Sequence, residues 1–208
     1  MIVTERISEV HNEDCMIGMA RYPDKYFDLA VVDPPYGIGE DGGKCRTRGS
    51  KRTNGIKKGW DNNRPTKQYF KELIRVSKHQ IIWGGNYFAD MLQPSRCWLY
   101  WQKDMGGDFA DGELAWTSFD AVLKQYRKRS ETFDRIHPTQ KPVALYDWIY
   151  KNYLPQGGKV IDTHLGSGSN RIAANKAGNI DFTGFELDKD YYEAQEKRWK
   201  GFISQTRL

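Results

Sequence analysis

The sequence predicts an α/β protein whose largely parallel sheet is covered by helices on both faces. Short apolar runs alternate with segments of helical periodicity along the chain, which favours this class. The run at 27–32 is mostly apolar, as expected of a strand buried on both faces, and the run at 159–162 leads through a glycine-rich loop into a helix. The 208 residues suffice for one such domain and are too few for two.

Each element follows from its local pattern, in chain order. Strands are expected at 5–10, 27–32, 80–83, 96–102, 113–117, 159–162 and 180–186. Helices are expected at 16–21, 66–77, 143–153, 169–177 and 189–200, with an amphipathic spacing in the second of them. Residues 37–65 are rich in glycine and charge, which predicts a long mobile loop. Residues 124–134 are expected to be a basic, turn-like segment.

Composition indicates a folded protein with a polyanionic partner. Hydrophobic residues make up 38% of the chain and its net charge is +5. Three scattered cysteines (Cys15, Cys45 and Cys97) and four histidines show no zinc spacing, so we expect no metal. With no signal peptide or apolar span, a cytoplasmic location is expected.

Two basic clusters are candidate DNA contacts. The first lies in the expected loop and the second in the basic segment after the strand at 113–117. A phosphate-binding surface and a solvated loop or helix face are the alternatives for both. The candidate residues are Lys44, Arg46, Arg48, Lys51, Arg52, Lys57 and Lys58, followed by Lys124, Arg127, Lys128 and Arg129.

The loop after the strand at 159–162 is typical of a cofactor site. It runs Asp162-Thr-His-Leu-Gly-Ser-Gly168 into a helix, and its glycines allow a tight turn close to a ligand. Neither a P-loop lysine nor the third glycine of the dinucleotide fingerprint is present. Glu186 ends the next strand, where a carboxylate can accept both ribose hydroxyls. These features favour an adenosyl cofactor without a pyrophosphate over an ordinary tight turn.

Residues 33–36, Asp-Pro-Pro-Tyr, form the most specific motif. An aromatic amine is a poor nucleophile because its lone pair is delocalised, and two acceptors on its N–H bonds would free that pair. The Asp33 carboxylate and the Pro34 carbonyl offer such acceptors, and two prolines fix the backbone. Tyr36 offers a face on which a base can stack. A Pro-Pro loop ending a strand, with Asp33 as a turn residue, is the alternative.

Together these segments resemble the S-adenosylmethionine-dependent amino-group DNA methyltransferases over nearly the whole chain. Residues 33–36 match the catalytic motif, and residues 162–169 resemble the cofactor loop. Residues 137–142, His-Pro-Thr-Gln-Lys-Pro, resemble the segment that closes over the methionine end. The catalytic motif comes first, as in the permuted beta group. The resemblance implies a single Rossmann-like domain over 1–208, whose seven-stranded sheet has one antiparallel strand.

The resemblance also assigns roles by position. Asp33, Pro34, Pro35 and Tyr36 would handle the target base. S-adenosylmethionine would be held by Asp14, His137, Thr139, Lys141, Asp162, Gly166, Ser167, Gly168 and Glu186. Within this set, Asp162 would face the ammonium group, and Thr139 and Lys141 would lie near the carboxylate. Asp14 would meet the adenine amine, with a helix cap as its alternative role.

The expected activity is site-specific methylation of adenine N6 in double-stranded DNA, on a flipped-out base. Aspartate rather than serine at position 33 favours adenine N6 over cytosine N4 in this family. Target recognition is expected of a small insertion at about 102–135, and pairing of two copies as a homodimer is a further expectation. The cofactor loop has Thr163 and His164 where the family has Pro and Phe. Cytosine N4, an amine in RNA or protein, and a non-catalytic DNA-binding module are the alternatives.

Overall fold

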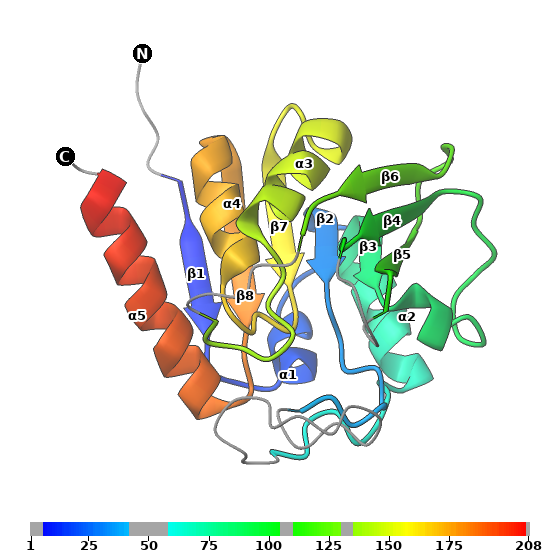
Figure 1. The fold of residues 1–208 in the computed structure, drawn as a ribbon, viewed down its shortest axis with the longest axis horizontal. Coiled ribbons are helices and arrows are strands. Elements are labelled where there is room, and N and C mark those ends of the chain that lie inside the picture. Colours follow the sequence, from blue (N-terminus) through cyan, green and yellow to red (C-terminus); the bar gives the residue numbers. More distant parts are fainter. Residues whose placement is uncertain (1–5, 42–57, 105–109, 130–134, 207–208) are drawn as a thin grey trace.

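The computed structural model describes residues 6–41, 58–104, 110–129 and 135–206, which form a mixed α/β fold (Figure 1). The strands are β1 (Ser8–His11), β2 (Phe27–Val32), β3 (Ser77–Trp83), β4 (Trp98–Gln102), β5 (Gly112–Thr117), β6 (Lys124–Arg127), β7 (Gly158–Asp162) and β8 (Ile180–Phe185). The helices are α1 (Cys15–Met19), α2 (Lys67–Val76), α3 (Val143–Tyr153), α4 (Ser169–Ala177) and α5 (Lys189–Thr206), with a short 3-10 turn at Gly85–Tyr87.

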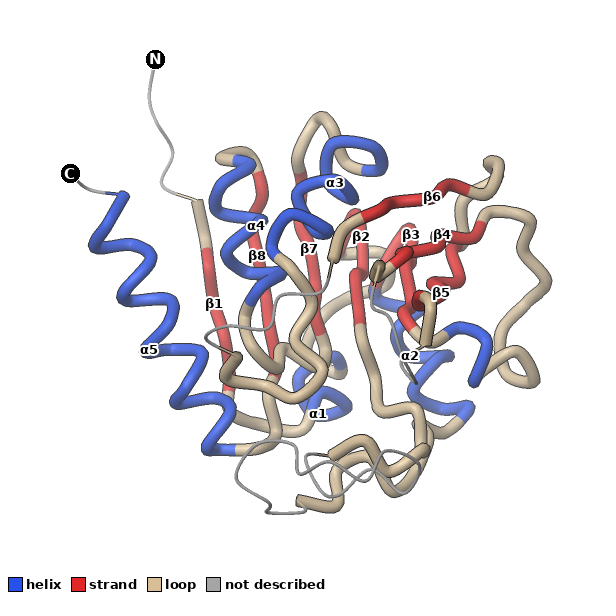
Figure 2. The backbone as a smooth tube through the Cα atoms, viewed as in Figure 1, coloured by secondary structure: helices blue, strands red, loops and turns tan. Residues whose placement is uncertain are grey.

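The described strands form one sheet in the order β1-β8-β7-β2-β3-β5-β4-β6. Strand β5 pairs antiparallel with both β3 and β4, while each of the other neighbouring pairs is parallel. The predicted fold class and its one antiparallel strand are therefore confirmed. The arrangement of helices around this sheet can be followed in Figure 2.

Two apolar cores lie on opposite faces of the sheet, and β2 shows how the sequence divides between them. Leu29 and Val31 pack in a cluster that includes residues of α3 and α4. The alternate residues Ala30 and Val32 pack in a second cluster with residues of α1 and α2. Because side chains alternate along a strand, a run that is apolar at nearly every position is buried on both faces.

The sheet has eight strands where seven were expected. Residues 124–127, predicted to be turn-like, form the edge strand β6, which pairs with β4 from Leu99↔Lys124 to Gln102↔Arg127. Three of its four side chains are exposed, so no apolar pattern marked it as a strand. Its pairing satisfies backbone groups along the outer edge of β4. The presumed recognition insertion at 102–135 is thus built partly as strands of the sheet.

The described ends of the long loop at 37–65 are tied together by two buried carboxylates. Asp61 accepts hydrogen bonds from the backbone N–H groups of Gly37 and Glu40, both at 2.8 Å. Asp41 accepts one from the N–H of Gly59 at 2.6 Å. Residues 37–41 and 58–61 are therefore held together at the base of the loop, and we call this pair of segments the loop neck. Within the described residues, no helix is both long and apolar enough to span a bilayer.

The topology brings the two sequence motifs to one edge of the sheet. Strands β2 and β7 are parallel neighbours, with Leu29 opposite Val160 and Ala30 opposite Ile161. The chain leaves β2 at residues 33–36 and leaves β7 at residues 163–168. Because parallel strands end at the same edge, the two motifs become neighbours although about 130 residues separate them.

Candidate active site

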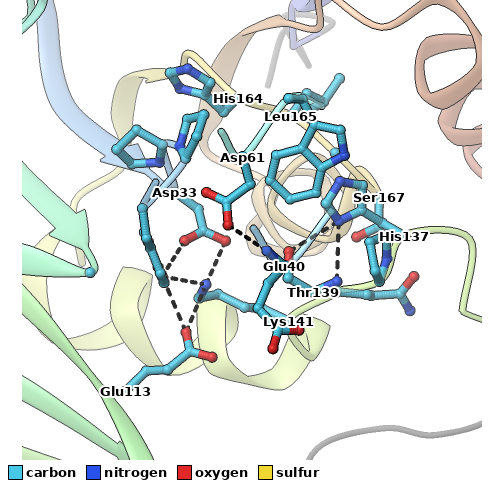
Figure 3. A pocket seen from close by; sticks show the side chains of 18 of the residues that line it. Asp33, Glu40, Asp61, Glu113, His137, Thr139, Lys141, His164, Leu165 and Ser167 are labelled. Carbon is cyan, nitrogen blue, oxygen red and sulfur yellow. Dashed lines mark hydrogen bonds and ion pairs between the residues drawn. The ribbon is translucent and has the colours of Figure 1, made fainter. Parts of the chain in front are cut away.

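A cavity of about 940 Å³ lies at this edge of the sheet (Figure 3). All four predicted catalytic residues, Asp33 to Tyr36, line it. The predicted cofactor residues that line it are Asp14, His137, Thr139, Lys141, Gly166, Ser167 and Glu186. Asp162 and Gly168 are not among the lining residues. The cavity therefore joins the catalytic motif to most of the predicted cofactor site.

At the catalytic end, Asp33 is held by two groups from the chain. Its Oδ1 accepts a hydrogen bond from the Tyr36 hydroxyl at 2.7 Å. Its Oδ2 is paired with the Lys141 ammonium at 2.5 Å. The same ammonium lies 2.9 Å from Glu113 Oε2 (Figure 3). Lys103 pairs with the other oxygen of Glu113. The sequence placed Lys141 at the cofactor's carboxylate, whereas the structure directs its ammonium to the catalytic aspartate.

The two carboxyl groups of this cluster differ in acidity. Burial would raise the pKa of Glu113, but Lys141 and Lys103 together lower it to about 2. Burial raises the pKa of Asp33, and repulsion by Glu113 adds to this, so Lys141 offsets the rise only in part. Asp33 is therefore the more basic of the two, and a proton entering the cluster binds there first.

Tyr36 belongs to an aromatic pair. Its ring stacks on that of Tyr87, with centroids 4.9 Å apart and planes 17° from parallel. It also packs on Gly84, where a Cβ would lie 2.2 Å from a ring carbon. Tyr87 is 38% exposed and lines the cavity, so it extends the surface on which a base can stack.

At the other end, Glu186 organises the glycine loop. Its Oε2 accepts a hydrogen bond from the backbone N–H of Gly166 at 2.8 Å, and its Oε1 accepts one from that of Asp188 at 2.9 Å. Burial raises the pKa of Glu186. A carboxylate has about four lone-pair sites, so each oxygen can still accept from a hydroxyl in the cavity.

The Asp162 carboxylate is turned into the protein. It is 3% exposed, and its oxygens accept hydrogen bonds from the Asn170 amide at 2.9 Å and the His164 N–H at 3.1 Å. Burial raises the pKa of Asp162 to about 7. In this structure the carboxylate ties the glycine loop to the start of α4. Its contact with the cofactor's ammonium group stays a prediction. Gly168, also behind the cavity wall, has a φ of 70° that favours glycine and begins α4.

The unusual residues Thr163 and His164 are accommodated by Tyr69 of α2. The Thr163 hydroxyl bonds to the Tyr69 hydroxyl at 2.6 Å and to His164 Nδ1 at 2.9 Å. The His164 ring also meets the Tyr69 ring edge-on. Burial lowers the pKa of His164 to about 4, so this histidine is neutral at pH 7. The Thr-His pair is thus satisfied by local partners and leaves the glycines unchanged.

An aromatic cluster covers the cavity beside the glycine loop. The His137 ring lies between Trp60, at the loop neck, and Tyr191 of α5, with centroid distances of 5.2 and 4.4 Å. Burial lowers the pKa of His137 to about 3, so the ring is neutral. Lys58 lies over the Tyr191 ring and pairs with Asp188 and Asp190, each at 2.7 Å. The neck is therefore attached to the start of α5.

The candidate DNA contacts fall into three groups. Lys58 is engaged with the two aspartates of the α5 start, which reduces its availability to phosphate. Lys124, Arg127 and Arg129 are exposed on or just after β6, Lys128 is half-buried, and Arg127 pairs with Asp104 at 2.7 Å. The remaining candidates, which lie outside the described residues, are Lys44, Arg46, Arg48, Lys51, Arg52 and Lys57.

Sequence patterns gave no site role to several residues of the cavity, among them Lys103, Glu113, Trp60 and Tyr87. Glu113 and Lys103 are charged residues at the ends of two strands and carry no motif, and their partner Lys141 is distant in sequence. Tyr87 carries no motif of its own, and its stacking on Tyr36 is what brings it into the site. In the described part of the chain, no cluster of three or more His, Cys, Asp or Glu could hold a metal.

In this α/β fold, one cavity brings the Asp-Pro-Pro-Tyr motif at 33–36 beside the glycine loop before α4. Residues 82–197 match the family described as DNA methylase (N6_N4_Mtase). The chain belongs to this family of S-adenosylmethionine-dependent enzymes and is a DNA methyltransferase of the N6/N4 type. The matched region holds the cofactor loop and the Glu113–Lys141 pair, and the Asp33 motif precedes it.

Individual relatives agree with this assignment. The chain is 24% identical to a putative methylase, YubD, of Escherichia coli K12, over 89% of this chain and 87% of that protein. It is 25% identical to the type II methyltransferase M2.DpnII of Streptococcus pneumoniae, over 67% of this chain and 48% of that enzyme. The match therefore spans about half the length of M2.DpnII.

Solved structures confirm the fold. The M1.HpyAVI–SAM complex superposes with a TM-score of 0.62 at 16% identity, covering 92% of this chain and 98% of that one. The PvuII cytosine-N4-specific DNA methyltransferase has a TM-score of 0.64 at 13% identity, covering 94% and 87%. A putative DNA modification methylase from Thermus thermophilus, complexed with S-adenosyl-L-methionine, has a TM-score of 0.60 at 15% identity, covering 95% of each chain.

Proposed function

We propose that this protein transfers a methyl group from S-adenosylmethionine to N6 of a flipped-out adenine in double-stranded DNA. The observation that carries the proposal is that one cavity is lined by both the Asp33 motif and the glycine loop before α4. An amine held at the first could meet a donor held at the second, so transfer needs no covalent enzyme intermediate. Holding both reactants in line can contribute about 7–11 kcal/mol at most.

The cavity lining fits an adenosyl cofactor without phosphates. Three of its lysines, Lys58, Lys103 and Lys141, are paired with carboxylates of the chain and do not form a pyrophosphate site. Glu186 and Asp14 offer acceptors for the ribose hydroxyls and the adenine amine, although Asp14 also caps α1 by accepting from Met16 N at 2.7 Å. When bound, S-adenosylmethionine supplies an electrophilic methyl group on a sulfonium.

The catalytic work of the chain falls to Asp33 and its neighbours. Asp33 and the Pro34 carbonyl would accept the two N–H bonds of the target amine and so free its lone pair. Tyr36 holds one oxygen of Asp33 in place, and each oxygen retains a lone pair for the amine. After transfer, the surplus proton would go to Asp33 rather than to Glu113, because Lys103 and Lys141 both stabilise the charge of Glu113.

The choice of adenine rests on aspartate as the first residue of the motif. A carboxylate is a stronger acceptor for an amine N–H than the serine hydroxyl that the family associates with cytosine N4. Cytosine N4 is the second candidate, since the PvuII structure that shares this fold is cytosine-N4-specific.

DNA binding, location and assembly are parts of the same proposal. The amine lies inside a duplex, so the base must leave the stack at a cost of a few kcal/mol. The exposed cations around β6 and the basic loop would contact phosphates, and the 102–135 insertion would read the sequence. A DNA-modifying role agrees with a cytoplasmic location, and pairing of two copies as a homodimer remains our expectation.

Methyl transfer to DNA tests the proposal. The protein is incubated with duplex DNA and tritium-labelled S-adenosylmethionine, and the DNA is hydrolysed for nucleoside analysis. We expect label in N6-methyl-2′-deoxyadenosine, whereas label in N4-methyl-2′-deoxycytidine supports the second candidate. Parallel reactions offer RNA or protein as the acceptor, and label there with none in DNA contradicts a DNA substrate.

Calorimetry separates an enzyme from a non-catalytic DNA-binding module of the same fold. We expect S-adenosylmethionine to bind the wild-type protein and to support transfer. Absence of cofactor binding, together with retained DNA binding, would favour the non-catalytic module.

A further inference from the structure

The most unusual feature of the cavity is a partly buried chain of alternating charges at its catalytic end, with Lys141 fully buried within it. Asp33, Lys141, Glu113 and Lys103 follow one another, each in contact with the next. They come from the loop after β2, the segment before α3, the first half of β5 and the residue after β4. Asp33 is the member that the proposed chemistry uses directly, so the other three require an explanation.

Lys141 is fully committed to this cluster. Its side chain is 2% exposed, and its ammonium has three donors. Three acceptors surround it: Asp33 Oδ2 at 2.5 Å, Glu113 Oε2 at 2.9 Å and the Tyr36 hydroxyl oxygen at 3.3 Å. The rings of Tyr36 and Trp83 flank the ammonium, with centroids 5.8 and 5.3 Å away. No donor is left for a cofactor carboxylate in this arrangement.

Glu113 is what makes a buried ammonium at this position tolerable. A buried charge with too few partners is strongly destabilising, and the carboxylate of Asp33 must keep lone pairs for its substrate. Glu113 supplies a second negative charge to Lys141, so Asp33 is not its sole counter-charge. The lone pairs of Asp33 that face the amine are thereby left free for the substrate. Lys103 in turn balances Glu113, so the four charges cancel.

We propose that Lys141 and Glu113 are positioning residues for Asp33: Lys141 fixes the plane of the catalytic carboxylate, and Glu113 fixes Lys141. This inference rests on the proposed function and assigns to Lys141 a role different from the cofactor contact expected from sequence. Misplacing a reacting group by about 1 Å can slow a reaction about 10²-fold, so the predicted effect falls on the transfer step.

The electrostatics give this proposal a signature that packing alone cannot produce. Lys141 lowers the pKa of Asp33, whereas Glu113 raises it. Removing the ammonium must therefore raise the pKa of Asp33, and neutralising Glu113 must lower it. Four other titratable groups interact electrostatically with Asp33, and both variants retain all of them. They are Tyr36, Tyr69 of α2, Tyr146 of α3 and Asp162 of β7.

The test compares Lys141→Met, Lys141→Arg and Glu113→Gln in the full-length protein, with Lys176→Met as control. Lys176 also forms an ion pair, with Asp147 at 2.5 Å, but does not line the cavity. The Asp33 carboxyl is titrated by ¹³C NMR, assigned with Asp33→Asn. Cofactor affinity and single-turnover transfer at saturating cofactor are measured on the same samples, after thermal melting has checked the fold.

We expect opposite shifts of the Asp33 titration, upward in Lys141→Met and downward in Glu113→Gln, with unchanged cofactor affinity. Transfer should fall about 10²-fold in Lys141→Met and recover in part in Lys141→Arg. Loss of cofactor affinity with normal transfer at saturation would overturn the inference in favour of a cofactor contact. An unmoved Asp33 titration in both variants would equally overturn it. A wild-type protein that shows no transfer refutes the proposed function instead, because the titration is read without turnover.

Discussion

The two ends of the cavity hold their carboxylates by different means. At the cofactor end, Glu186 accepts from backbone N–H groups, and Asp162 accepts from an amide and a backbone N–H. At the catalytic end, Asp33 and Glu113 are paired with Lys141 and Lys103. A neutral donor does not cancel the negative charge of an ionised carboxylate, whereas a paired ammonium group does. The first end therefore suits a cationic sulfonium cofactor, and the second suits a neutral base.

The largest expected effect comes from removing the catalytic carboxylate. Asp33→Ala should reduce methyl transfer by at least about 10²–10³-fold, because the amine loses an acceptor in its transition state. Cofactor affinity should change little, since the cofactor end keeps its own donors. Single-turnover kinetics and calorimetry measure the two quantities.

Glu13→Gln is the matched control for that variant. Glu13 also lines the cavity, but it is paired with Arg21 and lies away from the catalytic cluster. We expect near-normal transfer in the control. Normal turnover in Asp33→Ala would refute the chemistry assigned to this end.

Two glycines allow the ends to be disturbed separately. Gly84 and Gly168 share a φ of 70°, so alanine costs about 1–2 kcal/mol of strain at either position. At Gly84 the new Cβ also meets the Tyr36 ring, which should slow transfer without weakening cofactor binding. At Gly168 the strain acts on the glycine loop, which should weaken cofactor binding about tenfold.

Affinity and single-turnover rate, measured on both alanine variants, check this division. Equal losses of both quantities in both variants would mean that the two ends do not act separately.

The pH dependence of cofactor binding probes the charge left at the cofactor end. Burial raises the pKa of Asp162 to about 7, and a cationic ligand binds the ionised form. Affinity should therefore rise with pH up to about 7, by at most about tenfold per unit. Burial lowers the pKa of His137 to about 3 and that of His164 to about 4. Both rings are therefore largely neutral above pH 5 and do not contribute to this dependence. Titration calorimetry from pH 5 to 7, with Asp162→Asn as comparison, should show a slope that the variant flattens.

The smallest effect is expected outside both ends, at β6. Arg127→Gln breaks a solvent-screened pair with Asp104 and should leave cofactor affinity and the transfer step unchanged. If Arg127 contacts phosphate, DNA affinity should fall on all sequences alike, and the salt slope should decrease by about 1. Binding isotherms at several salt concentrations measure this slope. An unchanged slope removes Arg127 from the DNA contact.

Local patterns were sufficient to predict most of the fold. Strand β2 and helices α3 and α4 begin and end where the sequence indicated. A buried apolar run marks β2, a proline precedes α3, and a glycine stands at each end of α4. Strand β6 gave no such signal, since it pairs through its backbone and exposes most of its side chains. Its formation depends on the edge of β4, which is a tertiary contact.

The candidate site was predictable where a motif carries the chemistry. Asp33, Tyr36 and Gly166 line the cavity as expected. The contacts of Lys141 were not predictable, because they depend on Glu113, a partner on the distant strand β5. The orientation of Asp162 depends likewise on Asn170, in the first turn of α4.

The central claim is that residues 33–36 and 162–168 act on one amine and one methyl donor in a single cavity. Single-molecule mapping of modified bases in DNA from cells that express either the wild-type protein or Asp33→Ala tests it most directly. We predict N6-methyladenine at one recurring sequence with the wild-type protein and unmodified DNA with the variant. Unmodified DNA in both cases, or the same modification in both, would contradict the account.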